Sequence, residues 1–148
     1  MRIWIALLAT LVGSSAAAQS YPSQPVRLIS PFPPGGSVDI TARLISEPLG
    51  AQLGTRIVVD NRSGASGNIG MEAAARAAPD GYTLVLNTIP LVTNQSLFEK
   101  LPWDPARDFA PIGMVATSPH VLVVPNRVAA TKVDDLVRLA RANPGKLS

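Results

Sequence analysis

Pro31-Phe32-Pro33-Pro34-Gly35-Gly36-Ser37-Val38-Asp39 is the stretch that decides the fold of this chain. It follows an apolar run, residues 26–30, that predicts a strand, and it precedes residues 40–53, whose pattern predicts a helix. The prolines stiffen the turn because each fixes φ and lacks an N–H group. The glycine pair allows positive φ and lets a ligand approach main-chain amides. This combination is typical of the ligand-binding edge of an open α/β sheet, although a plain strand–helix connection has the same pattern.

The same strand–loop–helix order occurs twice more along the chain. Residues 56–61 contain a β-branched run that predicts a second strand, and the glycine-rich loop 63–68 leads into a predicted helix, residues 69–78. Residues 83–86 predict a third strand, followed by a helix around residues 91–99. Right-handed crossovers would make the three strands parallel and bring their three loops to one edge of the sheet. The sequence therefore predicts an α/β fold with a ligand crevice at that edge.

The first predicted helix contains a proline. We expect this helix to bury one apolar face and to bend or break at Pro48, because an interior proline costs about 3 kcal/mol or forces a kink. The positions predicted to be buried are Ile40, Leu44, Leu49 and Leu53.

The C-terminal third of the sequence begins with an irregular, proline-containing stretch, residues 102–111. Residues 112–116 and 121–124 then predict two further strands. Thr131, with Asp134 three residues later, forms a weak capping-box pattern at the start of a last helix. The apolar face of that helix consists of Val133, Leu136, Val137 and Ala140.

Residues 1–18 have the pattern of a secretory signal peptide. A basic start at Arg2 precedes an apolar run too short to span a bilayer comfortably, and Ala16-Ala17-Ala18 provides small residues for cleavage before Gln19. We therefore expect an exported protein that does not span the membrane after cleavage. The chain contains no cysteine, so its fold depends on its core and not on disulfides.

The charges of the mature chain are few and scattered. Removal of residues 1–18 takes away Arg2 alone, which lowers the formal net charge from +3 to about +2. No basic run or basic–aromatic patch indicates a nucleic-acid partner.

Catalytic motifs are weak throughout the sequence. Gly64-Ala65-Ser66-Gly67-Asn68 resembles a nucleophile elbow, but Asn68 stands where the last glycine belongs, and His120 is the only histidine. One histidine and no cysteine also make a zinc site unfavourable, and no phosphate-loop or dinucleotide pattern is present. Asp39 could contact a ligand or simply favour the helix dipole. These observations favour binding over catalysis and predict no enzyme activity, no cofactor and no metal.

Four ordered motifs give the chain a family resemblance. The sequence from about Tyr21 onward resembles the Bug family, the periplasmic solute receptors of tripartite tricarboxylate transporters. The motifs are Pro31–Asp39, Val58–Gly70, Pro79–Leu84, and Leu101–Pro105 with Asp108–Pro111.

The resemblance implies a two-lobed fold of the periplasmic-binding-protein type II class. Residues 19–118 would form an incomplete first lobe with a parallel-rich sheet and flanking helices, and residues 119–148 the start of a second lobe. Because chains of the family are about twice as long, we expect this sequence to be a truncated receptor.

The resemblance also implies a ligand and a site. A small carboxylate would be held by loop amides and bridging waters, and membrane subunits of the transporter would be the partners. A periplasmic sensor that presents its ligand to a signalling partner remains an alternative. By motif match, the ligand-binding residues are Phe32, Pro34, Gly35, Gly36, Asp39, Ser66, Gly67, Asn68, Thr88 and Asn94. Gln95 replaces the proline that usually follows Asn94 in the family.

Overall fold

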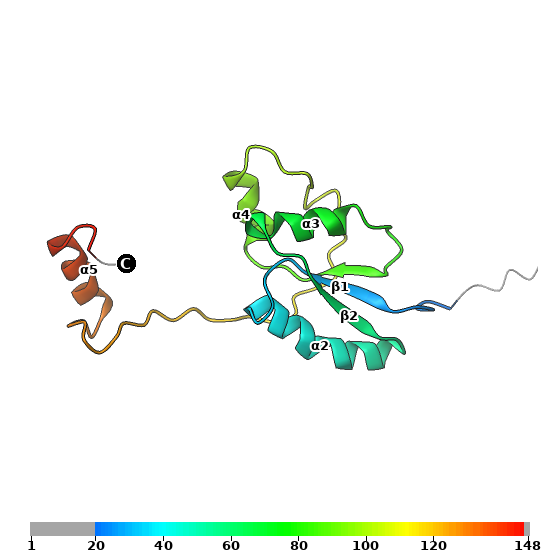
Figure 1. Cartoon of the computed structure of the whole chain (residues 1–148), viewed down its shortest axis with the longest axis horizontal. Helices are drawn as coiled ribbons and strands as arrows, with labels where there is room; N and C mark the ends of the chain where they lie inside the picture. The colour runs from blue at the N-terminus through cyan, green and yellow to red at the C-terminus, as the bar shows by residue number, and fades with distance from the viewer. Residues whose placement is uncertain (1–19, 147–148) are drawn as a thin grey trace, which may run out of the picture. The chain divides into compact units, whose positions relative to one another are not determined.

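The computed structural model describes residues 20–146, and the predicted signal peptide lies outside them (Figure 1). The chain divides into two compact units, one ending at Ile112 and the other beginning at Gly113. The assignment of residues 19–118 and 119–148 to two lobes stays a prediction.

The first unit is built on a three-stranded parallel sheet. Its strands are β1 (Val26–Ser30), β2 (Ile57–Asn61) and β3 (Thr83–Val85), in the order β2-β1-β3. Both neighbours pair with β1 in parallel, as the sequence predicts, and Ser30 is in register with Asn61. The carboxyl ends of all three strands therefore lie at one edge of the sheet.

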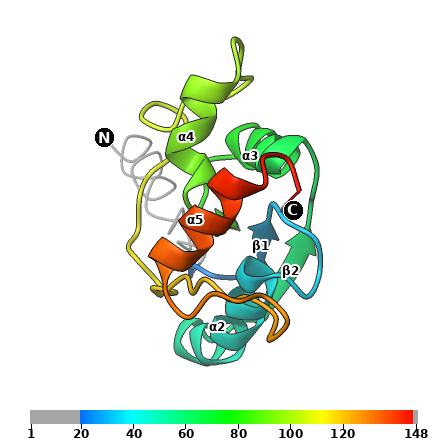
Figure 2. The ribbon, with the colours of Figure 1, turned by 90° about the vertical axis from the view of Figure 1, so that its left-hand side faces the viewer.

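Helices cover both faces of this sheet. Helix α2 (Ser37–Leu53) lies on one face and α3 (Asn68–Ala75) on the other, as Figures 1 and 2 show. The core on the α2 side consists of Val26, Leu28, Ala42 and Ile57. Burial of these apolar side chains stabilises the packing of α2 on the sheet.

The buried face predicted for the first helix is wrong at its N-terminal half. Ile40 is 51% exposed and Leu44 is 72% exposed. The helix begins at Ser37, three residues earlier than predicted, so the stripe that faces the sheet begins at Val38. That stripe continues through Ala42, Ile45, Leu49 and Leu53, a spacing of three or four residues throughout.

The predicted break at Pro48 is also wrong, because α2 is continuous from Ser37 to Leu53. Proline removes the N–H that would bond to the carbonyl of Leu44. Pro48 and Leu44 are both exposed, so this carbonyl lies on the solvent side of the helix, where water can replace the lost donor.

Helix α3 approaches the sheet closely at a glycine. It follows a single 3₁₀ turn, η1 (Ala65–Gly67), and ends at Ala75, three residues before the predicted end. A Cβ atom placed on Gly70 would lie 2.7 Å from Cβ of Pro31 and 2.9 Å from the carbonyl oxygen of Arg62. Only glycine therefore allows α3 to sit this close to the first loop.

The first unit ends with α4 (Pro90–Leu97) and an irregular stretch, as predicted. In that stretch the buried indole ring of Trp103 lies edge-on to Phe109, with 6.0 Å between the ring centroids. The Asp104 N–H donates to the Asp108 carboxylate, and the Asp108 N–H donates to the Asp104 carbonyl, which closes the turn. Among residues 20–146, no helix combines the length and the apolar character that crossing a membrane requires.

The two strands predicted at residues 112–116 and 121–124 do not form, and both segments are irregular and exposed. Their residue types suit strands, but a strand needs a neighbour, and no segment within residues 20–146 pairs with them. The second unit does contain a helix, α5 (Val133–Ala142). Its start differs from the predicted capping box, because the Thr131 N–H and hydroxyl both lie 3.1 Å from the carboxylate of Asp135 and not of Asp134.

Candidate functional site

The first glycine-rich loop uses its own glycine amides. The Gly35 N–H donates to Oδ2 of Asp39 at 2.8 Å, and the Gly36 N–H donates to the carbonyl of Pro33 at 3.3 Å. Gly35 adopts a φ of +82°, which favours glycine at the tip of this turn. The two amides that the sequence predicts as ligand donors are therefore engaged within the loop.

The free donors of this loop lie one residue further on. The first intrahelical bond of α2 runs from the Ile40 N–H to the carbonyl of Gly36 at 2.9 Å, so the amides of Ser37, Val38 and Asp39 precede the helical hydrogen-bond ladder. Gly36 occupies the N-cap and has no side chain that could cap them. Three N–H groups at the positive end of the helix dipole thus have no intrahelical acceptor, an arrangement that favours an anion.

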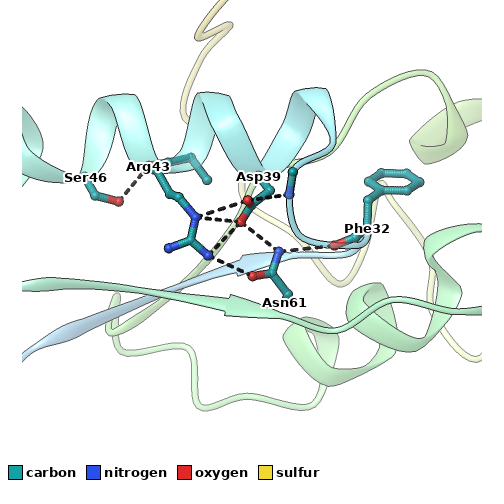
Figure 3. A network of polar contacts seen from close by, with 7 residues as sticks. Phe32, Asp39, Arg43, Ser46 and Asn61 are labelled. Atoms are coloured by element: carbon teal, nitrogen blue, oxygen red, sulfur yellow. Dashed lines mark hydrogen bonds and ion pairs between the residues drawn. The ribbon is translucent and has the colours of Figure 1, made fainter.

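Asp39 is the centre of a polar network beneath this loop (Figure 3). Its carboxylate, on a residue only 3% exposed, accepts from the Gly35 N–H, from Nε of Arg43 at 3.0 Å and from Nδ2 of Asn61 at 2.9 Å. The hydrogen bond from Arg43, then those from Gly35 and Asn61, lowers the pKa of Asp39 to about 2. Asp39 therefore fixes the shape of the loop and has its charge balanced by Arg43.

Asn61 is a site residue that the sequence analysis missed. Its Nδ2 also donates to the carbonyl of Phe32 at 3.2 Å, and its Oδ1 accepts from Nη2 of Arg43 at 3.2 Å. Figure 3 shows Arg43 and Asn61 converging on Asp39, while the ring of Phe32 points away from the network. Its position in the sheet is the feature that could have identified Asn61, because it ends β2 opposite Ser30, the last residue before the first loop.

The second glycine-rich loop has an unusual backbone. Four consecutive residues have positive φ: Gly64 (+129°), Ala65 (+46°), Ser66 (+56°) and Gly67 (+89°). Glycine adopts such angles freely, but left-handed conformation costs other residues about 1–2 kcal/mol each. The Gly67 N–H donates to the carbonyl of Gly64 at 2.9 Å, which closes the loop as a tight turn.

Asn94 and Asn68 meet beneath the second loop. Nδ2 of Asn94 donates to the carbonyl of Ser66 at 3.0 Å and to Oδ1 of Asn68 at 2.8 Å. Asn94 is 1% exposed and Asn68 is also buried. The structure therefore brings these three predicted residues together, with the Nδ2 donors of Asn94 directed at the protein.

The two loops touch through Phe32 and Gly67. A Cβ atom on Gly67 would lie 3.3 Å from Cζ of Phe32, so the ring rests directly on the glycine backbone. Pro34 lies exposed at the tip of the first loop, and Thr88 is exposed after β3. The structure thus places Phe32 and Gly67 side by side.

The carboxyl ends of β1 and β3 carry two further polar side chains that the sequence analysis did not select. Ser30 is fully buried, and its hydroxyl has no hydrogen-bond partner among the described residues. The Nδ2 of Asn87 likewise has none, while its Oδ1 accepts from the Thr88 N–H at 2.7 Å. Both groups are hydrogen-bond donors at the carboxyl edge of the sheet.

Comparison with known proteins identifies the family. A sequence model of the family described as "Tripartite tricarboxylate transporter family receptor" matches residues 41–148. The chain belongs to this family of receptors. It is 40% identical over 150 residues to the "UPF0065 protein in tcbD-tcbE intergenic region" of Pseudomonas sp. (strain P51), and the match covers 99% of this chain. It is 39% identical over 139 residues to "Protein BugT" of Bordetella pertussis, covering 93% of this chain, which agrees with the predicted Bug resemblance.

Solved structures of receptors give the same result for the fold. A protein described as a "periplasmic transporter" superposes with a TM-score of 0.81 at 41% identity, over 87% of this chain and 44% of that one. Rpa4515 of R. palustris, solved with adipate, gives 0.80 at 39% identity over 86% and 43% of the two chains. MatC of Rhodopseudomonas palustris, with bound malate, gives 0.75 at 29% identity over 82% and 42%. The predicted α/β, periplasmic-binding-protein-like fold is therefore confirmed.

The chain spans 45% of the length of its Pseudomonas relative and 43% of BugT. The family is one of receptors and not of enzymes, which agrees with the prediction of a non-enzymatic role.

Proposed function

We propose that this chain forms part of an exported receptor that binds a small carboxylate compound in the periplasm for a tripartite tricarboxylate-type transporter. The observation that carries the proposal is the N-terminus of α2, where the amides of Ser37, Val38 and Asp39 precede the helical ladder at the carboxyl edge of the sheet. Two related proteins solved with adipate and with malate support a carboxylate ligand.

Local electrostatics support an anionic ligand at this position. Asp39 would repel a carboxylate if its charge were free, but Arg43 contacts both of its oxygens, at 3.0 and 3.1 Å. The positive end of the helix dipole then dominates the field near the amides. Hydrogen bonds from neutral amides to a charged carboxylate are worth roughly 1.5–3 kcal/mol each, enough for one or two of them to determine affinity.

The periplasmic location and the transporter partner are parts of the same proposal. They are supported by the family description, by the related structure described as a periplasmic transporter, and by the signal-peptide pattern of residues 1–18. Delivery of the ligand to membrane subunits is the role that the family description favours.

A pair of substitutions at Ser37 tests the amide site. Ser37→Pro removes the N–H at the first helical position, where proline is well tolerated, and Gly36 already has the extended conformation that a following proline requires (φ −74°, ψ 165°). Ser37→Ala is the matched control, because it removes the hydroxyl and keeps the N–H. We expect Ser37→Pro to weaken adipate binding to the mature protein at least about tenfold relative to Ser37→Ala, or ~1.4 kcal/mol, by isothermal titration calorimetry. Equal affinities in two variants with unchanged circular dichroism would overturn the proposed site.

A further inference from the structure

We infer that Asn94 is a positioning residue of this site: it holds the second glycine-rich loop, residues 64–67, in its left-handed conformation. The hydrogen bonds from Asn94 to Ser66 and Asn68 are called the asparagine clasp below. The effect of the clasp on ligand affinity rests on the proposed function, whereas its effect on the loop does not.

The loop needs an external constraint to keep its shape. Ala65 and Ser66 both have positive φ, in the region that residues with a Cβ atom rarely occupy. Two backbone hydrogen bonds, from the Gly67 N–H to the Gly64 carbonyl and from the Asn68 N–H to the Ala65 carbonyl, close the turn around these two residues. Backbone conformations of this kind persist where surrounding structure determines them, and they cluster at ligand sites.

The clasp supplies that constraint from a distant part of the chain. Asn94 lies 28 residues after Ser66 and 26 after Asn68, yet both of its Nδ2 hydrogens have acceptors there, at 3.0 and 2.8 Å. Because both neighbours accept, the side-chain amide can have only one orientation. The side chain is also 1% exposed, so water does not compete for these bonds. The Ser66 carbonyl is thereby fixed at the point where the backbone is left-handed.

Asn94 is the anchor of α4 as well. It is the buried residue of this helix, whereas Val92 and Leu97 on the same helix are well exposed. The contact between α4 and the 3₁₀ turn of the loop therefore includes a buried polar side chain. A residue in this position can transmit the placement of α4 to the loop.

The second loop in turn helps to position the first loop. Gly67 lies against the ring of Phe32, and the carbonyl of Phe32 accepts from Asn61, which also bonds to Asp39. The contacts thus run from Asn94 to the second loop at Ser66, and from Gly67 of that loop to Phe32. From the carbonyl of Phe32 they continue through Asn61 to Asp39, in the first turn of α2. Asn94 consequently acts on the ligand site through the loops.

Asn94→Asp tests the clasp with a change of one group. The substitution keeps the size of the side chain and replaces the donating NH₂ by an oxygen, which faces two acceptors. Gln95→Glu is the matched control, because it makes the same chemical change at the next, exposed residue of α4. We expect hydrogen exchange at the Gly67 amide to accelerate at least about tenfold in Asn94→Asp and to stay unchanged in Gln95→Glu. If Asn94→Asp does not fold, Asn94→Ala replaces it as the test variant. It introduces no charge and should also accelerate hydrogen exchange at the Gly67 amide.

A second substitution separates positioning from general stability. Glycine accepts positive φ without strain, so Ser66→Gly in the Asn94→Asp protein should restore slow exchange at Gly67 and most of the lost affinity for adipate. A residue that only stabilised the fold would not be rescued in this way. Unchanged exchange at Gly67 in both Asn94→Asp and Asn94→Ala would overturn the inference. If exchange at Gly67 accelerates in the Asn94 variants but the original protein binds neither adipate nor malate, the clasp is upheld and the proposed function is refuted.

Discussion

Gly70→Ala tests the close packing of α3 against the first loop. A Cβ atom at this position would lie 2.7 Å from Cβ of Pro31, 2.8 Å from Cα of Pro31 and 2.9 Å from the carbonyl oxygen of Arg62. Two of these three atoms belong to the backbone and cannot rotate away. The backbone at Gly70 has no positive φ, so the cost of a methyl group here is one of packing.

The expected magnitude follows from two opposing terms. Overpacking of a tight contact costs about 1–3 kcal/mol, and three contacts below 3.0 Å place this site in the upper part of that range. Replacement of glycine by alanine inside a helix contributes about 0.8–1.0 kcal/mol in the opposite direction. We therefore expect a net loss of about 1–2 kcal/mol in the free energy of unfolding. With an m value of about 1–3 kcal/mol/M, the urea midpoint falls by roughly 0.3–2 M.

Urea denaturation of the mature protein, followed by circular dichroism, measures this loss. Gly113→Ala is the control, because a Cβ atom there meets no atom within 4 Å, and its free energy of unfolding should stay within about 0.5 kcal/mol of the original. If Gly70→Ala were as stable as Gly113→Ala, or more stable, α3 would not rest on Pro31 as described, and the packing that places the second loop beside the first would be refuted.

Two further predictions concern Asp39 and Trp103. The pKa of Asp39 is lowered from 3.8 to about 2, so its contribution to stability is full above about pH 4–5 and is lost as the pH falls through about 2. The difference in urea midpoint between the original protein and Asp39→Asn should therefore shrink between pH 5 and pH 2, and a difference independent of pH would contradict the network. Trp103→Phe removes an indole N–H that has no partner among the described residues and keeps an aromatic ring beside Phe109. By the same assay, Trp103→Phe should lower the free energy of unfolding clearly less than Trp103→Ala, for which we expect a loss of about 3–5 kcal/mol. Equal losses for the two variants would refute this account.

The parallel sheet could be predicted from the sequence because its signals are local. Each strand is a short apolar or β-branched run followed directly by a loop rich in glycine or polar residues, and the helices between them have room for right-handed crossovers. The start of α2 was harder to predict, because Ser37 and Val38 follow two prolines and two glycines and resemble a continuation of the turn. That difference of three residues moved the predicted buried face from Val38 and Ala42 to Ile40 and Leu44.

Site residues were predictable by position but not by role. Asp39 and Asn94 lie in the site region, yet each also bonds to a distant residue: Asp39 to Asn61, 22 residues away, and Asn94 to Ser66, 28 residues away. No local pattern shows that these side chains serve other parts of the protein. The segments 112–116 and 121–124 illustrate the same limit, because strand formation depends on a neighbour that residue type alone does not specify.

The most direct measurement of the central claim is an NMR titration of the ¹⁵N-labelled mature protein with adipate. If the N-terminus of α2 holds a carboxylate, the amide resonances of Ser37, Val38 and Asp39 should shift progressively and reach saturation. Saturable shifts confined to other amides, or no shift at residues 37–39 at saturating adipate, would contradict the claim that these helix amides form the carboxylate site.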